Sequence, residues 1–85
     1  MVPMSSHSSK LETLSHLKIG RKAKIIEFKD DGAVCQRLLE MGITPGEDVK
    51  VIRFAPMGDP IEIEIRGYRL SLRKQEADVI VVELL

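Results

Sequence analysis

Residues 60–72, PIEIEIRGYRLSL, alternate apolar and polar side chains on both sides of the dipeptide Arg66-Gly67. A period of two is typical of a strand with one buried face, and a two-residue connection is typical of a tight hairpin. On the outer face this turn places Glu64 opposite Arg69, so a single register makes every cross-strand pair chemically compatible. We therefore expect an antiparallel hairpin with three apolar pairs on its inner face: Ile65 with Tyr68, Ile63 with Leu70, and Ile61 with Leu72.

Residues 32–46, GAVCQRLLEMGITPG, carry the pattern of one short amphipathic helix with a defined end. Asp31 is the expected N-cap, and Gly42 is the expected residue beyond the C-terminus, because glycine adopts the left-handed conformation without a penalty. Ile43 is expected to make the apolar contact of a Schellman stop, and Pro45-Gly46 to form the centre of a type II turn. At about 100° per residue the apolar side chains share one wide arc: Val34, Cys35, Leu38, Leu39 and Met41.

Three other segments have the composition of short strands. They are residues 22–29 (KAKIIEFK), 48–55 (DVKVIRFA) and 79–84 (VIVVEL). The doublets Ile25-Ile26 and Val51-Ile52 interrupt the alternation in the first two segments, which predicts a bulge or a sharp bend in each. We also expect one helical turn around Leu14 and Leu17, and another over residues 73–77.

The expected elements are five short strands, with one helix between the first and second strands. This arrangement predicts a mainly β protein that forms a small, partly open SH3-like barrel. A five-stranded OB barrel is the alternative, but that fold usually places its helix between the third and fourth strands, where this chain has only a tight turn. A chain of 85 residues is enough for one modest core. We expect one domain over residues 11–85, preceded by a polar, Ser-rich tail over residues 1–10.

The charge balance limits the classes of partner. Lys and Arg together number 13, as do Asp and Glu, so the formal net charge is zero. A neutral chain lacks the basic field on which general binding to nucleic acids or acidic membranes depends, although a local basic patch is compatible with it. The single cysteine cannot form an internal disulfide, and no apolar run is long enough to span a bilayer. We expect a cytoplasmic protein with no nucleic-acid partner and no membrane insertion.

Residues that could carry chemistry are few and scattered. Cys35 lies near the middle of the helix's apolar arc and is expected to be a buried, small apolar side chain. The two histidines, His7 and His16, do not show the close spacing of a structural zinc site. Glu62 and Glu64 alternate outward along a strand, which is typical of a solvated face and not of a catalytic pair. We therefore expect a protein that is not an enzyme, with no catalytic residue, metal ligand or cofactor.

Two apolar features are better suited to contact with another protein. Leu39 and Met41 lie at the two margins of the helix's arc, which is wider than a small barrel is expected to cover, although core packing is the alternative for each. The loop at residues 55–60 contains two prolines, so Pro56 and Met57 would lose little entropy on binding; Met57 folded back over the barrel end is the alternative. Such surface would suit a different protein or a second copy of the chain in a homo-oligomer.

A basic cluster accompanies the hairpin. Arg66, at the turn, and Arg69, on the outer face, are predicted to contact a partner electrostatically, together with Arg73 and Lys74. Cross-strand pairing with glutamates and protection of an edge strand are the alternative roles for these side chains. The predicted contact residues of this cluster are Arg66 and Arg69.

Three motifs occur in this chain in the same order as in a known family. They are LLEMGITPG at residues 38–46, APMGDP at residues 55–60, and LSLRK at residues 70–74. With the alternating strand between the second and third motifs, they resemble the FeoA family, the small cytosolic accessory proteins of ferrous iron transport in bacteria and archaea. The resemblance covers roughly residues 23–83 and implies an SH3-like fold.

The resemblance implies a non-enzymatic module that binds the cytosolic GTPase domain of FeoB, the membrane permease for ferrous iron. An alternative is a detached metal-sensing domain, because the same fold resembles the C-terminal domains of iron- and manganese-dependent repressors. A third hypothesis is a binder of single-stranded nucleic acid. For that role Phe28, Phe54 and Tyr68 would have to form a stacking platform, whereas we expect them mainly on core faces. We favour the transporter accessory protein.

Overall fold

The structure is a computed structural model and describes residues 11–29 and 32–85 of the chain. Within these ranges, six strands are connected by two short helices and one 3-10 turn. The strands are β1 (Leu11–Thr13), β2 (Lys22–Phe28), β3 (Asp48–Phe54), β4 (Ile61–Ile65), β5 (Tyr68–Leu72) and β6 (Ile80–Leu84). The 3-10 turn is η1 (Leu14–His16), and the helices are α2 (Ala33–Glu40) and α3 (Lys74–Ala77).

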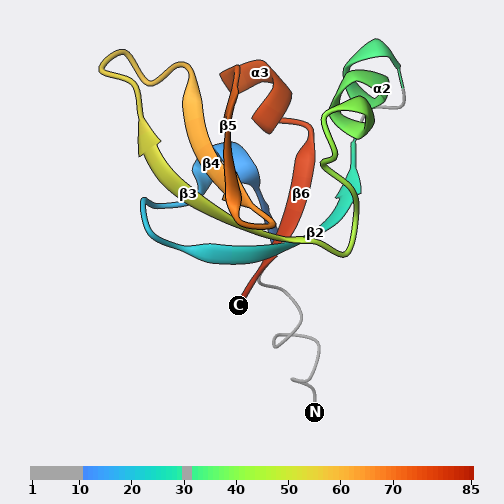
Figure 1. Cartoon of the computed structure of the whole chain (residues 1–85), viewed down its shortest axis with the longest axis horizontal. Coiled ribbons are helices and arrows are strands. Elements are labelled where there is room, and N and C mark those ends of the chain that lie inside the picture. Colours follow the sequence, from blue (N-terminus) through green and yellow to red (C-terminus); the bar gives the residue numbers. More distant parts are fainter. Residues whose placement is uncertain (1–10, 30–31) are drawn as a thin grey trace.

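All six strands belong to one antiparallel sheet in the order β1-β6-β2-β3-β4-β5. The sheet curls into a partly open barrel, and α2, α3 and the loop between β3 and β4 lie at the same end of it (Figure 1). The prediction of a mainly β, partly open barrel with one short helix early in the chain is confirmed.

The sheet has one strand more than the sequence predicts. Residues Leu11–Thr13 form β1, which pairs antiparallel with β6 near the other end of the chain. Three residues are too few to show alternation, and no local pattern reveals so distant a partner. The helical turn predicted around Leu14 and Leu17 is present as η1, and both leucines are buried. Because β1 precedes it, α2 lies between the second and third strands instead of the first and second.

The hairpin of β4 and β5 has the predicted register. The φ angles of Arg66 and Gly67 are 52° and 88°, the left-handed values that a two-residue hairpin turn requires. Tyr68 shares the inner face with Ile65, as predicted, but it is not a core residue, because its side chain is 42% exposed. β5 is an outer strand of the sheet, so the sheet covers the ring from one side only. All four predicted pairs are present: Ile61↔Leu72, Ile63↔Leu70, Ile65↔Tyr68 and Glu64↔Arg69.

Both apolar doublets mark irregularities in the strands, as predicted. The pairing of β2 with β6 shifts at Ile26, and the pairing of β3 with β4 shifts at Ile52. The residue before each shift, Ile25 or Val51, is buried, whereas Ile26 is 37% exposed. Each bulge therefore turns one apolar residue outward and lets a seven-residue strand bend around the core.

α2 ends in the predicted Schellman stop. Gly42 has a φ of 89°, and its N–H donates to the carbonyl oxygen of Leu39 at 3.0 Å. The N–H of Ile43 donates to the carbonyl oxygen of Leu38, also at 3.0 Å. The side chains of Leu38 and Ile43 are fully buried, so the residues that close the motif also fix the helix to the core.

The segment after this stop forms the predicted type II turn around Pro45-Gly46. The N–H of Glu47 donates to the carbonyl oxygen of Thr44 at 3.3 Å, and Gly46 has a φ of 96°. At the other end of α2, Gly32 occupies the N-cap position. The predicted N-cap, Asp31, and the predicted tail, residues 1–10, lie outside the described residues.

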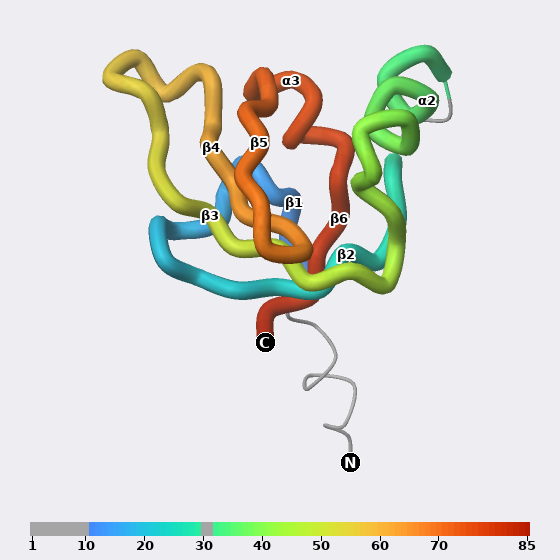
Figure 2. Tube along the Cα trace, in the orientation of Figure 1, coloured from blue at the N-terminus to red at the C-terminus, as the bar shows by residue number. Residues whose placement is uncertain are grey.

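One hydrophobic core fills the barrel. α2 contributes a single fully buried side chain, Leu38, because the helix lies at the rim of the barrel (Figure 2). Cys35 was expected to be buried and is only partly so, for the same reason. In the described ranges no helix is long and apolar enough to cross a membrane. The buried apolar residues are Leu14, Leu17, Ala23, Ile25, Leu38, Ile43, Val49, Val51, Ile61, Ile63, Ile65, Leu72, Ala77, Ile80 and Val82.

Substitution of Gly42 by alanine is expected to destabilise the domain. The left-handed conformation costs an alanine about 1–2 kcal/mol, and the new Cβ would lie 3.2 Å from the hydroxyl of Tyr68. Urea denaturation of Gly42→Ala and Gly46→Ala separates the cost of the left-handed backbone from the cost of the close contact. Gly46→Ala carries the first cost alone, because a Cβ at Gly46 meets nothing within 4 Å. We expect a loss of about 1–2 kcal/mol for Gly46→Ala and a larger loss for Gly42→Ala. A Gly42→Ala variant as stable as the parent would contradict the described stop.

Candidate partner-binding surfaces

The predicted contact residues do not form a single site. Leu39 and Met41 lie at the end of α2, and Arg66 lies in the turn between β4 and β5, with its Nη2 3.9 Å from a Cβ built on Gly42. We call these three residues the α2-end surface. Pro56 and Met57 lie in the loop between β3 and β4. β4 separates that loop from the turn, and its five residues span about 17 Å. The two apolar features are therefore separate surfaces.

The α2-end surface is held together by Arg66. One guanidinium nitrogen of Arg66, Nη1, lies 3.4 Å from Oε2 of Glu47, in the turn that follows α2. A hydrogen bond with Tyr68 and the charge of Glu47 together raise the pKa of Arg66 above its usual value. The Tyr68 hydroxyl is also the atom closest to a Cβ built on Gly42. Arg66 therefore joins the hairpin turn to the end of the helix, and its guanidinium is already engaged within the chain.

The two apolar residues of this surface differ in accessibility. Leu39 is 44% exposed, whereas Met41 is partly buried and packs against the core. The apolar arc of α2 thus extends beyond the area that the barrel covers, but only on the side of Leu39. Leu39 is the member of the pair that offers apolar area to a partner without any rearrangement.

Arg69 lies on the outer face of the hairpin. It faces Glu64 across the two strands, as predicted, but among the described residues it takes part in no ion pair within 4.0 Å. Glu62, the other outward-facing glutamate of β4, forms an ion pair with Arg53 on β3, with 3.0 Å between Nε of Arg53 and Oε1 of Glu62. The Glu62 and Glu64 side chains are both partly exposed on the outer face of the sheet.

The Met57 loop, residues 55–60, presents one fully accessible side chain. Met57 is 91% exposed, so it does not fold back over the barrel. The loop is closed by two main-chain hydrogen bonds, from Gly58 N–H to the Ala55 carbonyl at 2.7 Å and from Ala55 N–H to the Pro60 carbonyl at 3.0 Å. An exposed methionine on a closed loop is preorganised for contact with an apolar surface.

Asp59 fixes the Met57 loop to α3. Its carboxylate accepts a hydrogen bond of 3.0 Å from the backbone N–H of Lys74, at the start of α3, and lies 4.0 Å from the guanidinium of Arg73. The contact joins loop and helix, which are neighbours at the same end of the barrel (Figure 1). The carboxylate thus satisfies one of the free N–H groups of a helix start.

Glu76 joins α3 to α2, and the sequence reading missed it. Its side chain is almost fully buried, accepts a hydrogen bond of 2.8 Å from the backbone N–H of Arg73, and lies 3.0 Å from the guanidinium of Arg37. A glutamate three residues after the residue that precedes a helix is half of a capping box. Glu76 stands at this position relative to Arg73, but Arg73 occupies the place where a capping box usually has Ser or Thr.

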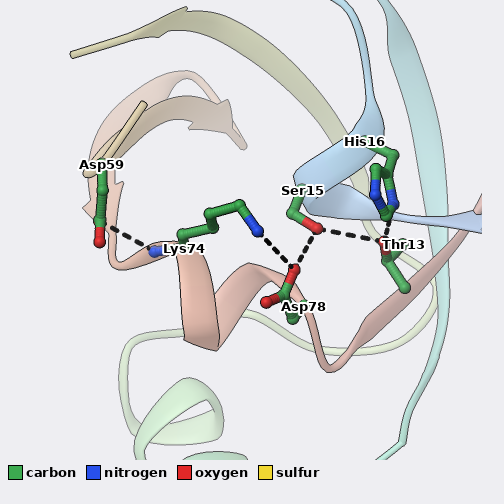
Figure 3. Close-up of polar contacts among 6 residues, drawn as sticks. All are labelled: Thr13, Ser15, His16, Asp59, Lys74 and Asp78. Atoms are coloured by element: carbon green, nitrogen blue, oxygen red, sulfur yellow. Dashed lines mark hydrogen bonds and ion pairs between the residues drawn. The ribbon is translucent and has the colours of Figure 1, made fainter. Parts of the chain in front are cut away.

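A polar network on the other side of α3 connects it to η1 (Figure 3). The hydroxyl of Ser15 donates a hydrogen bond to the carboxylate of Asp78, which lowers the pKa of Asp78 below its usual value. The ammonium of Lys74 lies 3.7 Å from the same carboxylate. On the η1 side, the Thr13 hydroxyl lies 3.2 Å from the hydroxyl of Ser15 and 2.8 Å from Nδ1 of His16. The network attaches the first described segment of the chain, β1 and η1, to α3.

The network does not have the arrangement of a catalytic site. His16 contacts Thr13 instead of Ser15, so the histidine is not placed to take the proton of the serine hydroxyl. Over residues 11–29 and 32–85, no group of three or more His, Cys, Asp or Glu side chains lies close enough together to hold a metal ion. His7, in the predicted tail, lies outside the described residues. The accessible features of the described chain are instead the α2-end surface and the Met57 loop, each of which is fixed by hydrogen bonds.

Comparison with known families identifies the fold. The sequence pattern of the FeoA domain family matches residues 12–84, which is nearly the whole described chain. The chain belongs to the FeoA family. FeoA domains are non-catalytic accessory domains of ferrous iron transport with an SH3-like fold.

Solved structures of FeoA proteins share this architecture. A FeoA-like protein from Clostridium acetobutylicum is 42% identical, with a TM-score of 0.84, and the match covers 91% of this chain and 90% of that one. FeoA from Stenotrophomonas maltophilia, described as an SH3 domain protein and solved in complex with zinc, is 32% identical with a TM-score of 0.74. That match covers 85% of this chain and 89% of the S. maltophilia chain. The predicted SH3-like class and the FeoA resemblance are confirmed.

A FeoA domain also occurs within a much longer relative. The Fe(2+) transport protein A/Fe(2+) transporter FeoB fusion protein of Porphyromonas gingivalis is 39% identical over 72 residues. The match covers 85% of this FeoA chain but only 8% of the length of the fusion protein.

Removal of the Ser15 hydroxyl is expected to weaken the network at α3 in a pH-dependent way. Because the hydrogen bond lowers the pKa of Asp78 in the folded state, its stabilisation is present above the unfolded pKa of about 3.9 and is lost as pH falls through the folded pKa. Asp78 is half exposed, so we expect Ser15→Ala to cost about 1 kcal/mol at neutral pH. Urea denaturation at about pH 7 and about pH 2.5 should show this difference shrinking at the lower pH.

The matched control is Ser71→Ala. Ser71 is exposed on β5, and among the described residues its hydroxyl has no hydrogen-bond partner. We expect this variant to be as stable as the parent at both pH values. Equal losses for the two serine variants would show that the contact with Asp78 has no role in stability.

Proposed function

We propose that this chain is a cytoplasmic, non-enzymatic protein that binds the cytosolic part of a FeoB-type ferrous iron transporter and modulates it. The observation that carries the proposal is the P. gingivalis fusion protein, in which a FeoA domain and a FeoB transporter share one polypeptide. Fusion through a short flexible linker holds two modules at an effective concentration of about millimolar. Such a fusion is expected for two modules that also bind each other when they are separate polypeptides.

The contact residues we propose are Leu39, Met41, Pro56, Met57, Arg66 and Arg69. Their accessibility ranks them. Leu39 and Met57 each expose apolar area, on the α2-end surface and the Met57 loop respectively. Arg69 carries an unpaired charge in the described part of the chain, so it is suited to steer an acidic partner. Arg66 and Met41 mainly hold the α2-end surface in shape.

The rigidity of both surfaces supports the proposal. Asp59 and the two loop hydrogen bonds fix the Met57 loop, while the Schellman stop fixes the end of α2. A partner therefore pays little ordering entropy at either surface. A protein interface of ordinary size buries about 800 Å² on each partner, a patch about 30 Å across. Because β4 separates the Met57 loop from the hairpin turn by about 17 Å, one interface of that size can span the length from the loop to Arg66.

We expect the full chain to bind the isolated cytosolic GTPase domain of a FeoB transporter. Isothermal titration calorimetry with the domain free of nucleotide, bound to GDP and bound to a non-hydrolysable GTP analogue measures the affinity in each state. A dissociation constant of about micromolar in at least one state is expected, which is the range of a transient interface. Absence of heat and of co-purification in all three states would refute the proposal.

We expect Leu39→Lys and Met57→Lys each to weaken this binding about tenfold, which corresponds to about 1.4 kcal/mol for an exposed apolar contact. Lysine near the C-terminal end of α2 is compatible with the helix dipole, so Leu39→Lys should fold normally. The matched control is Leu85→Lys, because Leu85 is 58% exposed after the end of β6 and belongs to neither surface. Equal weakening by all three variants would show a non-specific effect of charge. No weakening by Leu39→Lys or Met57→Lys would remove that surface from the interface.

A further inference from the structure

The end of the barrel beside β1 is hollow. A cavity of about 490 Å³, open to solvent, lies between β1, the end of β6 and the turn that leads into β2. Its volume falls within the range of about 300–1,000 Å³ that is typical of ligand sites. In Figure 2 the blue segment after β1 runs from β6 to the beginning of β2 and forms this end of the barrel. The lining residues are Glu12, His16, Leu17, Lys18, Ile19, Gly20, Arg21 and Leu84.

The cavity is lined by both polar and apolar side chains. Leu84 is partly buried and offers apolar surface to it, whereas Leu17 lies behind this surface in the core and is only 2% exposed. Ile19 is 61% exposed, more than any other large apolar residue described except Met57. Its exposure is built into the backbone, because Arg21 N–H donates to the Lys18 carbonyl at 3.0 Å and Gly20 N–H donates to the Val51 carbonyl at 2.7 Å. Ile19 is thus held at the tip of a closed turn.

Charged side chains stand at the rim of the cavity. Lys18 and Arg21 flank Ile19, and neither forms an ion pair or a side-chain hydrogen bond among residues 11–29 and 32–85. Glu12 stands on the β1 side of the cavity and is likewise unpaired there. Two cations at one side and one carboxylate at the other favour an anionic group next to Lys18 and Arg21, and disfavour one next to Glu12.

The sheet ends at this cavity. β1 is an outer strand that pairs with β6 on one side, and within the described residues no strand pairs with its other side. An unpaired strand edge accepts an extended peptide through main-chain hydrogen bonds, while neighbouring pockets select its side chains. Glu12 belongs to β1 and also lines the cavity, so edge and cavity are contiguous.

We propose that this end of the barrel binds an extended segment of a partner protein in which an apolar residue is adjacent to an acidic one. The segment runs along β1, its apolar side chain enters the cavity against Ile19 and Leu84, and its carboxylate meets Lys18 and Arg21. The inference goes beyond the proposed function, because it uses no residue of the α2-end surface or of the Met57 loop. Either proposal can fail while the other holds.

The test uses the isotope-labelled full chain and an N-acetylated, C-amidated hexapeptide, Ser-Gly-Leu-Glu-Gly-Ser, as the probe. We expect saturable amide shift changes at Glu12, at residues 16–21 and at Leu84. Replacement of the peptide's Glu by Gln should weaken binding about two- to fivefold, as expected for the loss of a surface ion pair. Replacement of its Leu by Ala should weaken binding about tenfold, through the lost apolar burial.

Protein variants locate the site. Arg21→Gln should reproduce the loss seen with the Gln peptide, and Lys29→Gln, which removes the same charge from an exposed position outside the cavity, should bind as the parent does. Ile19→Ser should weaken binding of the Leu peptide and leave that of the Ala peptide unchanged. Amide dispersion of each variant checks that it is folded.

Several results would overturn the proposal. These are the absence of saturable shifts at the cavity, equal affinity for the Glu and Gln peptides, or equal loss in Arg21→Gln and Lys29→Gln. Tighter binding of octanoate than of the peptide at the same amides would make a small amphipathic carboxylate the occupant. Movement of those amides on dilution of the chain alone would make a second copy the occupant.

Discussion

The left-handed residue at the end of α2 is the constraint on which the rest of this barrel depends. Gly42 lets the chain leave the helix so that Leu38 and Ile43 both enter the core. It also leaves room for the Tyr68 hydroxyl, which would lie 3.2 Å from a Cβ at that position. Arg66 then connects the hairpin turn to Glu47. The end of a helix, the start of β3 and the tip of a hairpin are thereby held as one assembly.

Features set by neighbouring residues could be predicted from the sequence. The register of β4 and β5 follows from strict alternation and a two-residue turn, and the bulges at Ile26 and Ile52 follow from doublets that break alternation. The Schellman stop follows from the position of Gly42 after an apolar arc. In each case the conformation is determined by residues that are close in sequence, so a sequence pattern is enough to predict it.

Features set by distant residues could not be predicted. β1 exists only because β6 pairs with it, and Glu76 is buried only because Arg37 of another helix meets it. Tyr68 fits an inward pattern yet is half exposed, since its place at the outer strand is a property of the whole sheet. The barrel-end cavity likewise unites Glu12 with Leu84. The family resemblance supplied the expected partner class, which the residues alone leave open.

The place of β6 has a consequence for how the protein is made. β6 is the last strand in the sequence, yet it lies between β1 and β2 in the sheet. A ribosome that adds about 5–20 residues per second takes roughly 3–13 s to synthesise the residues between β1 and its partner strand. During that interval β1 and one edge of β2 have no neighbour, so the nascent barrel stays open and its apolar interior is accessible to chaperones. Only the arrival of β6 joins β1 to the rest of the sheet.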